Sequence, residues 1–247
     1  MDNAAIYHRL DLVLRLVDTT TGMAVEERNV RFVSDRQSLK PISRGSGSYV
    51  FLNTGREDFS ITVQVYGFDP CTMQIRYEEL DSRLPMKEAF LIPSENAAWG
   101  EKVITFSGHL SGLEELEAVS FKTAHCCIHE FDERKRIMKV FQKGSRAAME
   151  DVFYGLIHMD TKSYERFEVV KEVSDGSFEL KSPLQEPFSV NSPIARIVFG
   201  RVGQDGEYVL RVRDDSDKLP YLVRYVVNGE ARFQVVDFQQ LEEVVLQ

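Results

Sequence analysis

The stretch LDLVLRLVD, residues 10–18, decides the fold class because its apolar side chains recur with a period of two. Successive side chains of an extended chain point to opposite faces, so one face of this stretch carries only leucines: Leu10, Leu12, Leu14 and Leu16. The other face mixes charged and branched side chains: Asp11, Val13, Arg15 and Val17. The pattern predicts a β-strand with one strongly apolar face.

Similar short alternating runs follow as far as residue 93. They are VRFV (30–33), GSYVFLN (47–53), FSITVQVYGF (59–68), CTMQIRY (71–77) and EAFLIP (88–93). Turn-forming residues separate these runs, and short strands at this spacing are typical of a small sandwich. We therefore expect a first domain over residues 1–93, a β-sandwich of about seven strands.

The second half is again dominated by alternation, which predicts four hairpins: residues 118–141, 152–173, 194–213 and 221–236. The last contains Asn228-Gly229, a strong signal for a two-residue hairpin turn. We expect a larger antiparallel β domain over residues 103–247, either a barrel or a sandwich. Two stretches also predict short helices: SGLEELEA (111–118) has capping-box spacing, and SRAAMEDVFYGLI (145–157) has apolar residues at helical intervals.

Two segments between the predicted strands are candidates for contacts with partners. Residues 94–102 are small and polar, as in a linker, but contain Trp99, which we expect to wedge between neighbouring domains. KSPLQEPFSVNSP (181–193) must be irregular because proline cannot donate to a sheet ladder, and such loops are often contact surfaces. The candidate interaction residues are Trp99, Pro183, Pro187 and Pro193.

The overall charge argues against two classes of partner. The 247 residues include 30 Lys and Arg against 39 Asp and Glu, a net charge of -9 that repels phosphate backbones and anionic lipid headgroups. Three cysteines are too few for a disulfide framework, the N-terminal residues lack the apolar core of a signal peptide, and no apolar run approaches about 18 residues. We expect no nucleic-acid binding, no membrane insertion, cytoplasmic synthesis and reduced thiols.

The segment HCCIH, residues 125–129, concentrates the residue types that most often bind metals or attack substrates. On a strand, His125, Cys127 and His129 would lie on one face about 7 Å apart, which is too far for all three to coordinate one ion. A catalytic cysteine would also need an imidazole aimed at its sulfur. We expect a partly buried strand, with zinc binding or thiol chemistry as the less favoured alternatives.

The remaining chemical signals are weak. Asp214, Asp215 and Asp217 form a carboxylate cluster suited to calcium, but the loop lacks the glycine and distal glutamate of an EF-hand. No phosphate-binding glycine loop, dinucleotide fingerprint, HExxH pair or GxSxG nucleophile motif occurs. The sequence therefore predicts no enzyme activity, no cofactor and no catalytic residue.

Residues 10–93 resemble the transthyretin-like or carboxypeptidase regulatory-like family of β-sandwiches. The residues that carry the resemblance are LVDTTTGMAVEERNVRF (16–32), GSGSYVF (45–51) and FSITVQVYGF (59–68). The resemblance implies a spacer, adhesive module or assembly part without shared catalytic residues. Many such domains belong to exported proteins, so the missing signal peptide is a departure from the family's pattern.

Taken together, these observations predict a non-catalytic structural or interaction protein. We expect protein partners, with homo-oligomers among the arrangements, in a particle assembled in the cytoplasm, such as a phage tail or contractile tail-like apparatus released by lysis. One alternative is a carbohydrate- or cell-surface-binding module with exposed Tyr208, Tyr221 and Tyr225, although their strand positions favour packing. The other alternative is the zinc or thiol enzyme centred on HCCIH.

Overall fold

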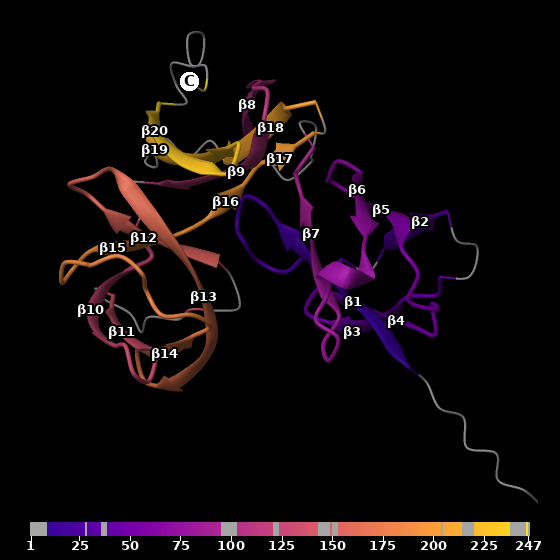
Figure 1. Cartoon of the computed structure of the whole chain (residues 1–247), viewed down its shortest axis with the longest axis horizontal. Coiled ribbons are helices and arrows are strands. Elements are labelled where there is room, and N and C mark those ends of the chain that lie inside the picture. Colours follow the sequence, from indigo (N-terminus) through magenta and orange to yellow (C-terminus); the bar gives the residue numbers. More distant parts are fainter. Residues whose placement is uncertain are drawn as a thin grey trace, which may run out of the picture. The chain divides into compact units, whose positions relative to one another are not determined.

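The fold is all-β, as the alternation predicts, and forms two compact units. A computed structural model describes residues 9–27, 29–35, 39–94, 103–120, 124–142, 149, 153–203, 205–213, 220–237 and 246. Unit 1 comprises Met1–Asp18 and Ala24–Trp99, and unit 2 comprises Thr19–Met23 and Gly100–Gln247 (Figure 1). Among the described residues the only helical element is a 3-10 turn, Tyr77–Glu79. No helix in this part of the chain is long and apolar enough to cross a membrane.

Unit 1 contains two sheets that share one apolar core. The first has the strand order β3 (Ile42–Gly45), β4 (Ser48–Leu52), β1 (Leu10–Asp18) and β7 (Met86–Leu91). Strand β1 pairs antiparallel with β4 and parallel with β7. The second sheet has the order β2 (Val30–Ser34), β5 (Phe59–Val65) and β6 (Cys71–Ile75).

The leucine face of β1 forms the centre of this core. Leu12, Leu14 and Leu16 are fully buried, which confirms the predicted apolar face, whereas Leu10 lies beyond a bulge in the pairing with β4 and is only half-buried. From the second sheet, the Phe32 ring packs edge-on against Tyr49 and Phe51 of β4, with ring centroids 4.9 and 5.5 Å apart. These contacts join the two sheets face to face.

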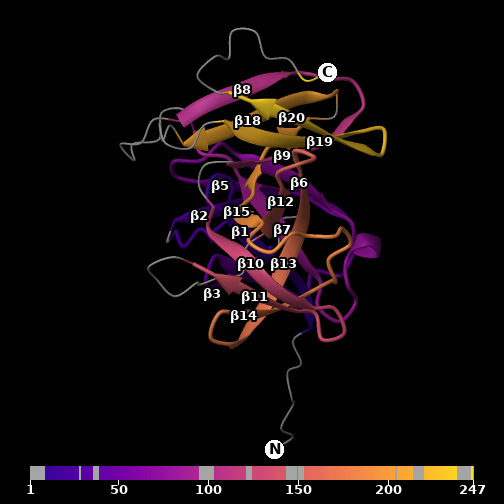
Figure 2. The same cartoon turned by 90° about the vertical axis from the view of Figure 1, so that its left-hand side faces the viewer.

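Unit 2 contains a closed barrel of six antiparallel strands (Figure 2). Their order around the barrel is β10 (Cys126–Asp132), β11 (Ile137–Phe141), β14 (Ser177–Leu180), β13 (Ser163–Ser174), β12 (Phe153–His158) and β15 (Pro193–Arg196). Closure leaves no free sheet edge within this ring. The core is formed mainly by branched, sulfur-containing and aromatic side chains that are nearly fully buried, among them Ile128, Met138, Tyr154, Leu156 and Phe178.

Two further sheets complete unit 2 around a second core. One has the order β16 (Val198–Phe199), β9 (Leu113–Ser120), β19 (Tyr221–Val227) and β20 (Glu230–Val236). The other has the order β17 (Arg201–Val202), β18 (Glu207–Arg213) and β8 (Val103–His109). The turn between β19 and β20 is the predicted Asn228-Gly229 step, with φ angles of 52° and 79°, as a type I′ turn requires.

The two predicted helices are wrong where the structure describes them. The first stretch overlaps strand β9, Leu113–Ser120, and the end of the second overlaps strand β12, Phe153–His158. Strand β9 pairs with β16 and β19, and β12 pairs with β13 and β15, so ladder hydrogen bonds on both edges outweigh local helix signals. All six residues of β12 are buried, and a strand buried on both faces shows no period of two that would distinguish it from a helix.

Candidate functional site

Cys126–His129 of the HCCIH segment lie in strand β10, as predicted, whereas His125 precedes the strand, and the potential ligands do not gather. Cys126 and Ile128 point into the barrel core, Cys127 is half-buried and His129 is exposed. The pairing between β10 and β11 shifts register at His129, which turns this side chain away from the regular alternation. Among the described residues there is no group of three or more His, Cys, Asp or Glu arranged to hold a metal ion.

The buried thiol of this segment is a poor nucleophile. Burial, with a smaller contribution from the neighbouring Cys127 thiol, raises the pKa of Cys126 to about 12. Since the thiolate is the reactive form, almost no Cys126 is ionised near neutral pH. All three cysteines are free thiols. Cys126 therefore acts as a small apolar core residue.

Two of the predicted interaction prolines line one hollow of the barrel. Pro187 and Pro193 line it, whereas Pro183 does not. Residues 181–192 are irregular, as predicted, but Pro193 is the first residue of β15, a position where a strand tolerates proline. Trp99 and the aspartates at 214, 215 and 217 lie outside the described residues.

The segment 181–192, which we call the proline loop, is held on the barrel by polar contacts. The Glu165 carboxylate of β13 accepts hydrogen bonds from the backbone N–H groups of Gln185 and Glu186, at 2.5 and 3.0 Å. The Asn191 N–H donates to the Ile128 carbonyl at 2.8 Å, and the Ile128 N–H donates to the Ser192 carbonyl at 3.0 Å. These bonds fix both halves of the loop in place.

Apolar contacts add to this anchoring. Leu184 and Phe188 of the loop pack against the barrel core, and Phe188 meets Phe131 of β10 edge-on, with ring centroids 6.3 Å apart. A loop that is anchored in this way loses little further conformational entropy when it contacts a partner.

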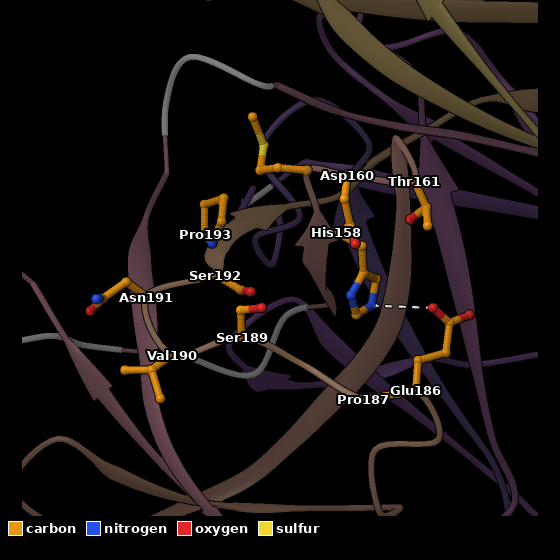
Figure 3. A pocket seen from close by; sticks show the side chains of 11 residues that line it. His158, Asp160, Thr161, Glu186, Pro187, Ser189, Val190, Asn191, Ser192 and Pro193 are labelled. Atoms are coloured by element: carbon orange, nitrogen blue, oxygen red, sulfur yellow. Dashed lines mark ion pairs between the residues drawn. The ribbon is translucent and has the colours of Figure 1, made fainter.

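The proline loop and the end of β12 enclose a hollow of about 470 Å³. His158, only 7% exposed, directs its Nε2 toward Glu186 Oε2 at 3.3 Å (Figure 3). This distance suits an ion pair when the imidazole is protonated, although the atoms are not aligned as a hydrogen bond. The hydroxyls of Ser189 and Ser192 point into the same space (Figure 3).

The wall of the hollow combines polar groups with exposed apolar side chains. Within the part of the chain that the structure describes, no hydrogen bond joins the Ser189 or Ser192 hydroxyl to His158. Its wall includes two exposed apolar side chains, Met159 at 57% and Val190 at 58%. Exposed apolar side chains beside polar groups are typical of protein contact sites.

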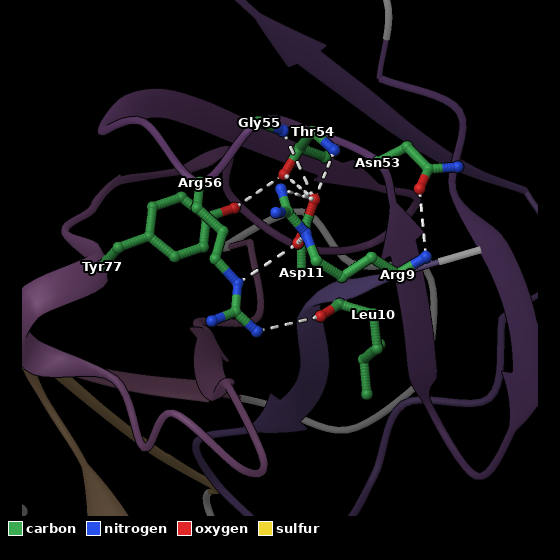
Figure 4. A network of polar contacts seen from close by, with 8 residues as sticks. All are labelled: Arg9, Leu10, Asp11, Asn53, Thr54, Gly55, Arg56 and Tyr77. Atoms are coloured by element: carbon green, nitrogen blue, oxygen red, sulfur yellow. Dashed lines mark hydrogen bonds and ion pairs between the residues drawn. The ribbon is translucent and has the colours of Figure 1, made fainter. Parts of the chain in front are cut away.

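Unit 1 contains a buried carboxylate that the sequence pattern places on the half-exposed face of β1. Asp11 is fully buried and lies 2.6 Å from Arg9 Nε and 3.2 Å from Arg56 Nε (Figure 4). It also accepts hydrogen bonds from the backbone N–H groups of Thr54, at 2.6 Å, and Gly55, at 3.3 Å. This network ties the loop after β4 to the start of β1 and is structural.

Unit 2 contains a second buried carboxylate, Glu117 of β9, which is 2% exposed. Its oxygens lie 3.2 Å from Arg224 Nη1 on β19 and 3.6 Å from Arg166 Nη1 on β13. The Arg166 guanidinium also stacks over the Phe153 ring at 4.2 Å. The cluster therefore connects the barrel to the adjoining sheet.

The residues that sequence analysis missed are therefore those brought together by tertiary structure. His158 and Glu186, separated by 28 positions in the chain, meet only because the proline loop folds back over β12. The only local signal is a histidine at the end of a predicted strand, which by itself is not specific.

No protein-family model matches the chain, and no curated protein gives a significant match.

Proposed function

We propose that this chain is a non-catalytic interaction protein that docks on a protein partner through the proline loop and the adjoining end of β12. The observation that carries the proposal is a loop fixed by hydrogen bonds and apolar packing that nevertheless exposes Val190 beside the exposed Met159. Preorganised loops with apolar tips bind partners at low entropic cost.

The same proposal accommodates the expected role in an assembly. A transthyretin-like sandwich in unit 1, with its resemblance to spacer and assembly modules, would set unit 2 at a distance from the body of a particle. We propose a cytoplasmically assembled multi-protein particle, such as a tail-like apparatus, as the setting.

Tyr208, Tyr221 and Tyr225 are each at most 3% exposed, so they are core residues and form no sugar-binding platform.

Native fractionation tests the proposal in the organism that makes the protein. Val190→Asp and Met159→Asp place a charge on the loop surface, and a charge facing an apolar contact costs several kcal/mol of binding. We expect the wild-type chain to elute with a larger complex and both variants to elute nearer the size of the free chain.

The matched control is Val170→Asp on β13, because Val170 is 49% exposed and does not line the hollow. This variant should fractionate like the wild type. Sedimentation of the purified chain separates self-association from binding to another protein. A wild-type chain that is monomeric in native lysate, or three variants that fractionate alike, would contradict the proposal.

A further inference from the structure

A second hollow of about 420 Å³ lies beside β15 in unit 2. Among its lining residues are Arg196 and His125, together with the hydroxyl of Thr21 and the amide of Gln142. Every described lining residue belongs to unit 2, and none of them is Asp or Glu. Among its described lining residues, the hollow therefore combines one permanent positive charge with hydrogen-bond donors and no opposing carboxylate.

Arg196 is unusual among the partly buried arginines of this unit. Its Nε is buried and has no hydrogen-bond acceptor among the described residues, and its Nη1 donates only to the Met23 sulfur at 3.7 Å. By contrast, Arg166 and Arg224 both lie within 4 Å of the Glu117 carboxylate. A thioether is a weak acceptor, so the guanidinium retains most of its capacity to bind an anion.

The unused edge of the guanidinium has a defined geometry. Because Nη1 faces Met23, the edge formed by Nε and Nη2 is the one without an acceptor in the described part of the chain. These two N–H groups are parallel and spaced to match the two oxygens of a carboxylate. Leaving such a group without a partner away from water costs free energy, which a bound anion would recover.

The neighbouring groups can complete the site. The Thr21 hydroxyl accepts the Met23 N–H at 3.2 Å, which leaves its own proton for a ligand oxygen. The His125 ring is held against the buried Tyr154 ring, with centroids 5.6 Å apart. Ala195, Val198 and the Tyr221 ring provide apolar wall for the body of a ligand.

We propose that this hollow binds a small organic carboxylate, with its two oxygens on the Nε and Nη2 edge of Arg196 and its apolar part against Ala195 and Tyr221. The single permanent charge among the described lining residues favours a monoanion over a phosphate dianion. The volume falls within the range of small-molecule sites and exceeds what a bare inorganic ion would fill. The proposal is independent of docking through the proline loop.

Calorimetric titration of the full chain with benzoate tests this site, with benzamide as the neutral isostere. At constant ionic strength we expect benzoate to bind at least about 10-fold more tightly than benzamide, because only the acid pairs with the guanidinium. Arg196→Met should weaken benzoate binding by about 10- to 100-fold. Thr21→Val keeps the arginine and should weaken it by about 3- to 10-fold.

Arg136→Met is the charge-matched control, because Arg136 pairs with Glu179 at 3.6 Å on the β11–β14 side of the barrel and does not line the hollow. It should bind benzoate like the wild type. Equal binding of benzoate and benzamide, unchanged binding in Arg196→Met, or no binding of benzoate at about 10 mM, a weak-ligand limit, would overturn the proposal. Tighter binding of phenyl phosphate than of benzoate would overturn the choice of a carboxylate headgroup.

Discussion

The carboxylate of Glu117 lies 3.2 Å from Nη1 of Arg224, yet the pKa of Glu117 is raised. Burial is the largest cause and raises the pKa of this carboxyl, whereas Arg166 and Arg224 lower it by less. The ion pairs therefore offset only part of the cost of removing the charge from water.

This balance predicts a pH dependence of stability. A raised carboxyl pKa means that Glu117 favours the folded state below its unfolded pKa of about 4.3, and that this contribution is lost as pH rises through the folded pKa. Relative to Glu117→Gln, the wild type should lose free energy of unfolding between about pH 4 and neutral pH, measured by urea unfolding. Glu115→Gln is the control, since Glu115 is exposed and also pairs with Arg224, at 2.8 Å. If the unfolding free energy of the wild type instead rose with pH relative to that of Glu117→Gln, the ion pairs would outweigh burial.

The Asp11 network predicts the opposite sign. Burial raises the pKa of Asp11, but hydrogen bonds from Arg9, Thr54 and Arg56 together lower it by more. The pKa of Asp11 therefore lies below the usual range. The stabilisation is present above the unfolded pKa of about 3.9 and is lost as pH falls through the folded pKa. Asp11→Asn should cost about 2 kcal/mol of unfolding free energy at neutral pH.

The control for this substitution is Glu79→Gln. Glu79 is exposed and pairs with Arg76 and Lys87 at 3.2 and 3.4 Å, so its loss should cost less than about 0.5 kcal/mol. Equal losses for the two variants would show that the Asp11 network behaves as a surface pair.

The close packing around Gly155 of β12 predicts that an added side chain lowers stability. A Cβ there would lie 2.9 Å from the Tyr164 ring on the neighbouring strand β13 and 3.0 Å from a Val119 methyl on β9 of another sheet. Gly155→Ala should therefore lower the unfolding free energy by about 1–3 kcal/mol. At Gly203 the nearest atom to an added Cβ is 3.5 Å away, so Gly203→Ala should change stability by less than about 0.5 kcal/mol. A neutral Gly155→Ala would show that Tyr164 can move aside.

Alkylation tests the burial of the Cys126 thiol in the HCCIH segment. Because burial raises the pKa of Cys126 to about 12, iodoacetamide at about pH 8 should leave this thiol unmodified in the native chain while it reacts with Cys127. Peptide mass spectrometry before and after denaturation measures the difference. Modification of Cys126 at the rate of Cys127 would contradict burial in the barrel.

Periodicity was sufficient to predict the fold class and much of the strand pairing. Residues 10–18 bury their leucine face, and residues 221–236 form a hairpin with a tight Asn-Gly turn. Both patterns are direct signals of extended structure. At Phe153–His158 periodicity predicted both a hairpin strand, which the pairing of β12 with β13 confirms, and a helix, which is wrong, because both faces of β12 are buried and the alternation is lost. It left barrel and sandwich undecided because closure depends on pairing between strands distant in sequence, such as β10 with β15.

The candidate sites were harder to predict for the same reason. The proline loop was predicted from its composition, but the partners that fix it, Glu165 and Ile128, are set by the fold. Arg196 belongs to an ordinary alternating strand, and its significance lies in the absence of a carboxylate beside it in the described part of the chain. A sequence shows which charges are present but does not show which of them meet.

Site-specific photo-crosslinking in the native host tests docking through the proline loop most directly. A photoreactive phenylalanine analogue replaces Val190 in one variant and Val170 in the other, two exposed apolar positions of which only the first lines the hollow. The account predicts a discrete adduct of the chain with one partner protein from position 190 and none from position 170. Identical adducts from both positions, or none from position 190, would contradict it.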